Sequence, residues 1–291
     1  MSNASLVQWL QRLETLHPRA MELGLERVAS VADALHLRPF PAAVVTVAGT
    51  NGKGSTCAVL ETLLEQAGRH TGCFTSPHLL RFNERIRVGG LEVADDEITC
   101  AFQQIDVARG TTSLTYFEFA TLAALLVFRE RAVDTCILEV GLGGRLDSVN
   151  IIDADVAVIT SIDLDHQQWL GESLDEIGRE KAGILRRNKP AVIAAMPPPS
   201  GLLAAVVESG ADPVYYAGTD FAVQAQPGGS GWQPRISENG EQRLLPVQPA
   251  SSLLPVNVCA ALQAVVALGL YPGDQQVSRA LTGLVPPAGR R

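Results

Sequence analysis

Short apolar segments recur along the chain and alternate with amphipathic stretches. The apolar segments lie at residues 44–48, 73–76, 135–140, 156–161 and 191–195. They are apolar throughout rather than at every second position, which indicates strands covered on both faces. Helical patterns occupy the intervening residues 56–67, 95–109, 117–131 and 174–186. This alternation predicts an α/β fold with a doubly wound, mostly parallel sheet.

The strand–helix alternation does not extend to the two ends of the chain. Helical patterns at 5–16 and 20–35 precede the first predicted strand, and two more, at 256–268 and 274–284, follow the last one. Between them, residues 214–248 hold short strand-like runs broken by glycine and proline, which predicts a small antiparallel β flap. Asp95 and Ser173 are the expected helix N-caps, and Gly68 is the expected helix stop.

Composition excludes several classes of protein. With 46% hydrophobic and 19% charged residues, the 291-residue chain is expected to be globular. Its net charge of −8 argues against a nucleic-acid partner, which needs a basic face. The five cysteines contain no C-x-x-C pair and predict reduced thiols rather than a disulfide framework or a zinc site. Without a signal pattern or a membrane-length apolar segment, we expect a cytoplasmic protein that does not bind membranes.

The sequence Gly-Thr-Asn-Gly-Lys-Gly-Ser at 49–55 stands between a predicted strand and a predicted helix. Its glycines let the backbone N–H groups point at one anion, and the helix N-terminus and Lys53 add positive charge. The spacing departs from the strict P-loop, because Gly54 follows Lys53 and the hydroxyl comes at Ser55. A turn that binds nothing is the alternative; the flanking strand and helix favour a site for nucleotide phosphates.

Polar side chains follow several predicted strands at their carboxyl ends, where ligands gather in a parallel sheet. Glu139 lies inside an apolar strand and would be costly to bury without a cation, such as a nucleotide-bound magnesium ion. The alternative is an edge-strand glutamate facing water. His166 is a candidate metal ligand or general base, or else a structural hydrogen-bonding residue. Ser76 brings a hydroxyl to the same edge.

Six segments of the chain together resemble one enzyme family. They are Val-Ala-Gly-Thr-Asn-Gly-Lys-Gly-Ser (47–55), Thr-Ser-Pro-His (75–78), Leu-Thr-Tyr-Phe-Glu (114–118), Leu-Glu-Val-Gly-Leu-Gly-Gly-Arg-Leu-Asp (138–147), Leu-Asp-His (164–166) and Gly-Arg-Glu-Lys-Ala-Gly-Ile (178–184). In this order they resemble the folylpolyglutamate synthase/dihydrofolate synthase family, ATP-dependent amide ligases related to the muramyl ligases.

The resemblance implies a nucleotide site and a magnesium site. The residues implied to hold ATP are Thr50, Asn51, Gly52, Lys53, Gly54 and Ser55, with Asn257 near the adenine and Arg290 at an interdomain hinge. The implied ligands of two magnesium ions are Ser76, Glu139, His166 and Lys181, the last as a carbamate. The catalytic residues would be Lys53, His166 and Lys181. From the sequence alone, Lys181 also fits a solvated lysine on a surface helix.

The resemblance also implies a pterin site. Its residues would be Glu22, Leu23, Gly24, Leu25, Thr115, Tyr116, Phe117, Glu118, Leu146, Asp147 and Ser148. An aromatic ring such as Phe117 can stack on a flat pterin, and the Asp147 carboxylate can accept from its N–H groups. For Tyr116 and Phe117, core packing at the start of a helix is the alternative.

The implied reaction is the ATP-dependent joining of L-glutamate to dihydropteroate and to folates, through an acyl phosphate, with release of ADP and phosphate. A muramyl-type peptide ligase and a non-catalytic P-loop nucleotide-binding module are the alternatives. We expect an ATP-binding ligase domain at 1–287 in a protein that is monomeric, as members of this family usually are. Residues 288–291 would begin the hinge to a second domain, although Ala288 replaces the family's proline. Without that domain, we expect nucleotide and pterin binding but little ligation.

Overall fold

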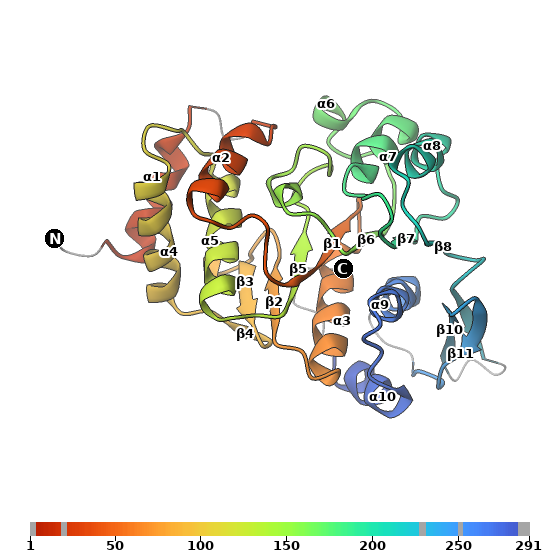
Figure 1. The fold of residues 1–291 in the computed structure, drawn as a ribbon. Coiled ribbons are helices and arrows are strands. Elements are labelled where there is room, and N and C mark those ends of the chain that lie inside the picture. The colour runs from red at the N-terminus through yellow and green to blue at the C-terminus, as the bar shows by residue number, and fades with distance from the viewer. Residues whose placement is uncertain (1–3, 19–21, 227–230, 250–252, 285–291) are drawn as a thin grey trace.

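The computed structural model describes the chain except residues 1–3, 19–21, 227–230, 250–252 and 285–291. Its main strands are β1 (Ala43–Ala48), β2 (Thr71–Phe74), β3 (Ile86–Val88), β4 (Leu91–Glu92), β5 (Thr135–Glu139), β6 (Val156–Ile159), β7 (Ala191–Ile193) and β8 (Val214–Tyr216). They form an eight-stranded sheet in the order β4-β3-β2-β5-β1-β6-β7-β8 (Figure 1).

The centre of this sheet is parallel and fully buried. β1 lies between β5 and β6, with Val45 opposite both Ile137 and Val156. At one edge of this sheet the pairing is antiparallel, between β2 and β3 and between β3 and β4. Every residue of β5 and β6 is buried, which explains why these strands are apolar without alternation. The predicted doubly wound, mostly parallel sheet is confirmed.

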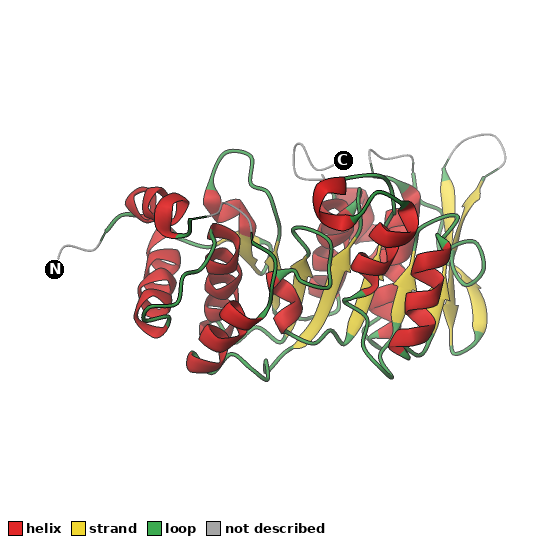
Figure 2. Cartoon of the chain, turned by 90° about the horizontal axis from the view of Figure 1, so that it is seen from above, coloured by secondary structure: helices red, strands yellow, loops and turns green. Residues whose placement is uncertain are grey.

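Helices cover both faces of the sheet. One face packs against α1 (Leu6–Leu16), α2 (Glu26–Ala34), α4 (Asp95–Ala108), α5 (Tyr116–Glu130), α7 (Leu174–Ala182) and α8 (Ser200–Ser209). The other face packs against α3 (Lys53–Gln66), α9 (Pro255–Ala267) and α10 (Asp274–Gly283). Short helical turns η1 (Phe82–Arg85), η2 (Ser148–Ile151) and α6 (Gln167–Leu170) occupy loops. Figure 2 shows the strands running between these layers.

Helix ends differ from the sequence prediction at several points. Ser173 caps α7 through its side chain and Gly68 follows the end of α3, as expected. The predicted Asp95 cap is wrong: Ala94 is the N-cap and Asp95 is the first helical residue, where its negative charge favours the helix dipole. The predicted helix at 20–35 begins only at Glu26, and Gly24 has a φ of 147°.

The small antiparallel sheet contains β9 (Ala222–Ala225), β10 (Trp232–Glu238) and β11 (Glu241–Leu244). The segment predicted for it, 214–248, begins too early, because Val214–Tyr216 extends the main sheet by pairing in parallel with β7. The small sheet packs on α9 through Trp232 and Ile236. Helix α8 and strands β3 and β4 were not predicted from the sequence.

Candidate active site

The glycine loop lies between the carboxyl end of β1 and the start of α3. Gly52 is the N-cap of α3 with a φ of 82°, so Lys53 is already the first helical residue, three positions earlier than predicted. The Lys53 ammonium donates to the carbonyls of Gly49 and Thr50 at 3.0 and 3.2 Å. The loop thus wraps around the lysine, and the positive N-terminus of α3 opens at the same point.

Neighbouring elements hold the loop in shape. The N–H of Asn51 donates to the Ser161 hydroxyl at 2.9 Å, and the Thr160 hydroxyl donates to the Asn51 carbonyl at 2.7 Å. On the opposite side, a Cβ added to Gly52 would lie 2.4 Å from the amide nitrogen of Asn257. Glycine is therefore required at position 52 both for its positive φ and for this close approach. Asn257, on α9, is in contact with the loop, whereas its role toward adenine stays a prediction.

Glu139 and Ser76 meet beside this loop. Glu139 lies opposite Val47 in the sheet and is buried at 3% exposure. Its Oε2 accepts from the backbone N–H of Ser76 at 2.9 Å. The alternative of an edge-strand glutamate facing water is wrong, because β5 is paired on both sides by β1 and β2. A buried carboxylate at the end of a strand, next to the glycine loop, is a suitable ligand for a magnesium ion.

His166 lies at the N-cap of α6 with a left-handed φ of 48°. Its side chain is about half exposed, and its Nε2 is 3.6 Å from Asp165 Oδ1. In the described part of the chain, no three His, Cys, Asp or Glu residues are grouped as a metal site. A metal here would need other oxygen donors, such as a serine hydroxyl, phosphate oxygens or a lysine carbamate, in addition to Glu139 and His166.

Lys181 lies on α7 and is buried at 3% exposure, so the alternative of a solvated surface lysine is wrong. Burial lowers its pKa to about 8, and the positive charge of Lys53 acts in the same direction. The opposite effect comes from Asp165 and Asp147. Gly144 permits this packing, because an added Cβ would lie 2.9 Å from the Lys181 carbonyl. The lysine therefore shares an electrostatic environment with the glycine loop.

A pocket of about 270 Å³ adjoins these groups. It is lined by Glu22, Leu23, Gly24, Ser76, Pro77, Arg85, Thr115, Phe117, Glu118, Gly141, Leu142, Leu146, Asp147, Ser148 and His166. Three segments distant in sequence, all predicted for a pterin site, thus surround one cavity. Two predicted residues do not line it: Leu25 faces another cavity, and Tyr116 packs edge-on against Phe82 at 6.0 Å. The sequence analysis missed Arg85, whose Nε donates to His78 at 2.7 Å.

Asp147 is a buried acid of this pocket, with 3% exposure. Its oxygens accept from the N–H groups of Leu142 and Val149 at 2.8 and 3.0 Å. Burial nevertheless raises its pKa to about 6. The Phe117 ring packs on Phe74, with ring centroids 5.7 Å apart, and also lines the pocket. Core packing is therefore observed, whereas stacking on a pterin stays a prediction.

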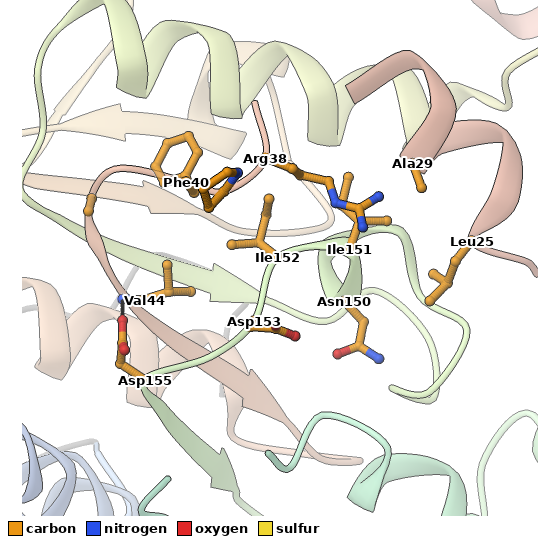
Figure 3. A pocket seen from close by; sticks show the side chains of 12 residues that line it. Leu25, Ala29, Arg38, Phe40, Val44, Asn150, Ile151, Ile152, Asp153 and Asp155 are labelled. Carbon is orange, nitrogen blue, oxygen red and sulfur yellow. Dashed lines mark hydrogen bonds between the residues drawn. The ribbon is translucent and has the colours of Figure 1, made fainter. Parts of the chain in front are cut away.

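A larger cavity of about 480 Å³ opens at the amino ends of β1 and β6 (Figure 3). Its carboxylates are already compensated. Asp155 accepts from the N–H of Val44 and from Lys189, at 2.9 and 2.8 Å, and Asp153 pairs with Arg186. It opens at the amino ends of these strands, whereas the glycine loop and Glu139 lie at carboxyl ends, so we do not assign it as the active site. Arg290 lies outside the described residues.

The parallel sheet, the glycine loop and the acids beside it are typical of P-loop nucleotide-binding domains. Residues 47–223 match the Mur ligase middle domain. The chain therefore belongs to the Mur ligase family, in its dihydrofolate synthase/folylpolyglutamate synthase branch. No helix among the described residues is long and apolar enough to cross a membrane.

Curated relatives are similar over part of the chain. The dihydrofolate synthase/folylpolyglutamate synthase of Escherichia coli is 54% identical over 207 residues, which is 71% of this chain and 49% of that protein. The Haemophilus influenzae protein of the same name is 50% identical over 203 residues, 69% of this chain and 46% of that protein. The chain spans about half the length of these relatives.

Solved structures are similar over nearly the whole chain. E. coli FolC in complex with DHPP and ADP has a TM-score of 0.92 at 43% identity, over 99% of this chain and 67% of that one. A Yersinia pestis bifunctional folylpolyglutamate synthase/dihydrofolate synthase complexed with AMPPNP and Mn has a TM-score of 0.87 at 43% identity, over 98% of this chain and 67% of that one.

Proposed function

We propose that this chain is the nucleotide- and pterin-binding part of an ATP-dependent ligase that joins L-glutamate to dihydropteroate and extends folate polyglutamates. The observation that carries the proposal is the meeting of the glycine loop, Glu139, Lys181 and the Asp147 pocket at one edge of the sheet. Relatives with this bifunctional name, and a FolC structure holding DHPP and ADP, support it over a muramyl-type ligase or a non-catalytic module.

The glycine loop binds the phosphates of ATP in this proposal. Lys53 exchanges its two carbonyl partners for phosphate oxygens, while the first N–H groups of α3 donate to the same anion. Thr50, Asn51, Gly54 and Ser55 complete the loop. Asn257 contacts Gly52 from the side of α9 and would border the base.

Ser76, Glu139, His166 and a carbamylated Lys181 would hold up to two magnesium ions. Bound magnesium neutralises charge on the transferring phosphoryl group. Glu139 fits this role because it is buried, lies beside the loop and is oriented by the Ser76 N–H. Lys181 fits because its lowered pKa leaves a larger neutral fraction, and only the neutral amine reacts with CO₂.

The pocket orients the pterin for reaction. Phe117 offers a ring face and Asp147 a carboxylate for the pterin N–H groups. The carboxylate at the other end of the substrate takes the γ-phosphoryl group of ATP, which gives an acyl phosphate and ADP. The amine of L-glutamate then attacks the acyl carbon, so that the amide forms and phosphate leaves.

Equilibrium binding of 7,8-dihydropteroate in the presence of MgATP tests this function. We expect saturable binding to the 291-residue chain and its loss in Asp147→Ala. Asp153→Ala is the matched control, because Asp153 is an exposed aspartate at the other cavity. MgATP binding without any pterin binding would contradict the proposal and favour a nucleotide-binding module.

A further inference from the structure

Arg27, in the first turn of α2, connects two walls of the pocket. Its Nη1 donates to Glu22 Oε1 at 2.6 Å, and its Nη2 donates to the Glu22 carbonyl at 3.2 Å. The same Nη2 donates to Glu118 Oε1 at 3.1 Å. Glu22 and Glu118 line the pocket, whereas Arg27 itself does not. One guanidinium therefore fixes both the backbone and the side chain of the 22–24 loop to the start of α5.

The ion pair between Arg27 and Glu118 compensates a buried negative charge. The Glu118 side chain is only 4% exposed, and among the described residues Arg27 forms the ion pair with it. Its other oxygen accepts from the N–H of Thr115 at 2.7 Å and thereby caps α5. Removal of the arginine would leave a buried carboxylate without its counter-charge, which is far more costly than the loss of an exposed ion pair.

We propose that Arg27 is a positioning residue that holds the 22–24 loop against α5 and so sets the affinity of the pocket for its pterin substrate. That the ligand is a pterin rests on the proposed function. The inference that Arg27 holds the loop is drawn from the three hydrogen bonds and does not depend on the ligand. Arg27 does not touch substrate in this proposal and acts through Glu22 and Glu118. Its two terminal nitrogens reach Glu22 and Glu118 at once, and the single ammonium of a lysine cannot reproduce this forked geometry.

A second arginine offers a matched control. Arg129, near the end of α5, donates from Nη1 to the carbonyl of Leu35, the C-cap of α2, at 2.6 Å. It therefore links the same two helices at their other ends. Neither Arg129 nor Leu35 lines the pocket. A purely structural role of Arg27 predicts the same behaviour for Arg27→Ala and Arg129→Ala.

The experiment compares the wild-type chain with Arg27→Ala, Arg27→Lys and Arg129→Ala. Amide hydrogen exchange of residues 22–25 and 115–118 is measured without ligand, and dissociation constants are measured for 7,8-dihydropteroate and MgATP. In Arg27→Ala we expect faster exchange in both segments and pteroate binding weakened about tenfold or more, with unchanged MgATP affinity. Arg27→Lys should be intermediate, and Arg129→Ala should bind pteroate like the wild type.

Unchanged exchange in residues 22–25 of Arg27→Ala would overturn the proposal, whatever ligand the pocket takes. Equal loss of pteroate affinity in Arg27→Ala and Arg129→Ala would also overturn it, because the effect would then come from general destabilisation. Thermal unfolding of all four proteins identifies a variant that has failed to fold, and Arg27→Lys then carries the test. Absence of pteroate binding by the wild type overturns the proposed function instead, so the two failures are distinguishable.

Discussion

The backbone N–H of Ser76 donates to Oε2 of Glu139 at 2.9 Å, although 63 positions separate the two residues in the chain. The bond joins the ends of β2 and β5, which are neighbours in the sheet. It orients a buried carboxylate at the edge where the glycine loop opens. We therefore expect Glu139 to act through its negative charge rather than as part of the fold alone.

Glu139→Gln separates these two contributions. The amide oxygen of glutamine can still accept from the Ser76 N–H, so we expect thermal stability close to that of the wild type. The loss of charge should weaken magnesium-supported ATP binding by about tenfold or more. Isothermal titration of ATP with magnesium and with EDTA measures this. Persistence of the full magnesium effect in the variant would rule out Glu139 as a metal ligand.

Lys53→Ala removes the ammonium around which the glycine loop folds. We expect MgATP binding to weaken about ten- to a hundredfold, because charge-assisted hydrogen bonds to phosphate are lost. Lys189→Ala is the control, since Lys189 pairs with Asp155 at the amino end of β6. Wild-type affinity in Lys53→Ala would show that the phosphates bind elsewhere.

The affinity for pteroate should depend on pH through Asp147. Burial raises the pKa of this carboxyl to about 6, so the acceptor form that pairs with pterin N–H groups is lost as the pH falls through that value. We expect pteroate binding to weaken about tenfold for each pH unit below the pKa. The effect on the stability of the fold has the opposite direction. Because burial raises this pKa, the folded protein holds the Asp147 proton more tightly than the unfolded chain, and the resulting stabilisation is lost as the pH rises through about 6.

Dissociation constants for pteroate across this pH range, with Asp147→Asn as the reference, check the prediction. The asparagine variant should bind weakly at every pH and show no dependence in this range. A wild-type affinity that stays constant through pH 6 would argue against ionised Asp147 as the acceptor.

Lys181 should form a carbamate more readily than an exposed lysine. Burial and the charge of Lys53 lower its pKa to about 8, so the neutral amine becomes the major form above that pH. With ¹³C-bicarbonate, we expect a carbamate signal in NMR spectra that grows from about pH 7 to about pH 9. Lys181→Arg should remove the signal and Lys189→Ala should keep it. A signal that survives in Lys181→Arg would assign the carbamate to another amine.

Much of the site was predictable because its chemistry is local in sequence. The glycine loop needs glycine where φ is positive, at Gly49 and Gly52, directly before the start of a helix, and such a pattern is visible in the sequence. Glu139 was recognisable as a polar residue in an apolar strand. The exact start of α3 was not, because the loop before Lys53 is in contact with Asn257 and Thr160, which are distant in the chain.

The positioning contacts were not predictable. Arg27 and Glu118 are 91 positions apart. The sequence around each residue gives no indication that the other is its partner. Likewise, Val214–Tyr216 resembles the short strands that follow it, yet it joins the main sheet because β7 offers an open parallel edge.

The sequence by itself determined the α/β alternation, the parallel sheet and the segments that carry charge and glycine, since these follow from local hydrophobic periodicity and backbone freedom. Only the tertiary structure decided which of those segments share a pocket, that Lys181 is buried and that Asp147 has a raised pKa. These properties depend on solvent exclusion and on distances between residues remote in the chain, and no local pattern encodes either of them.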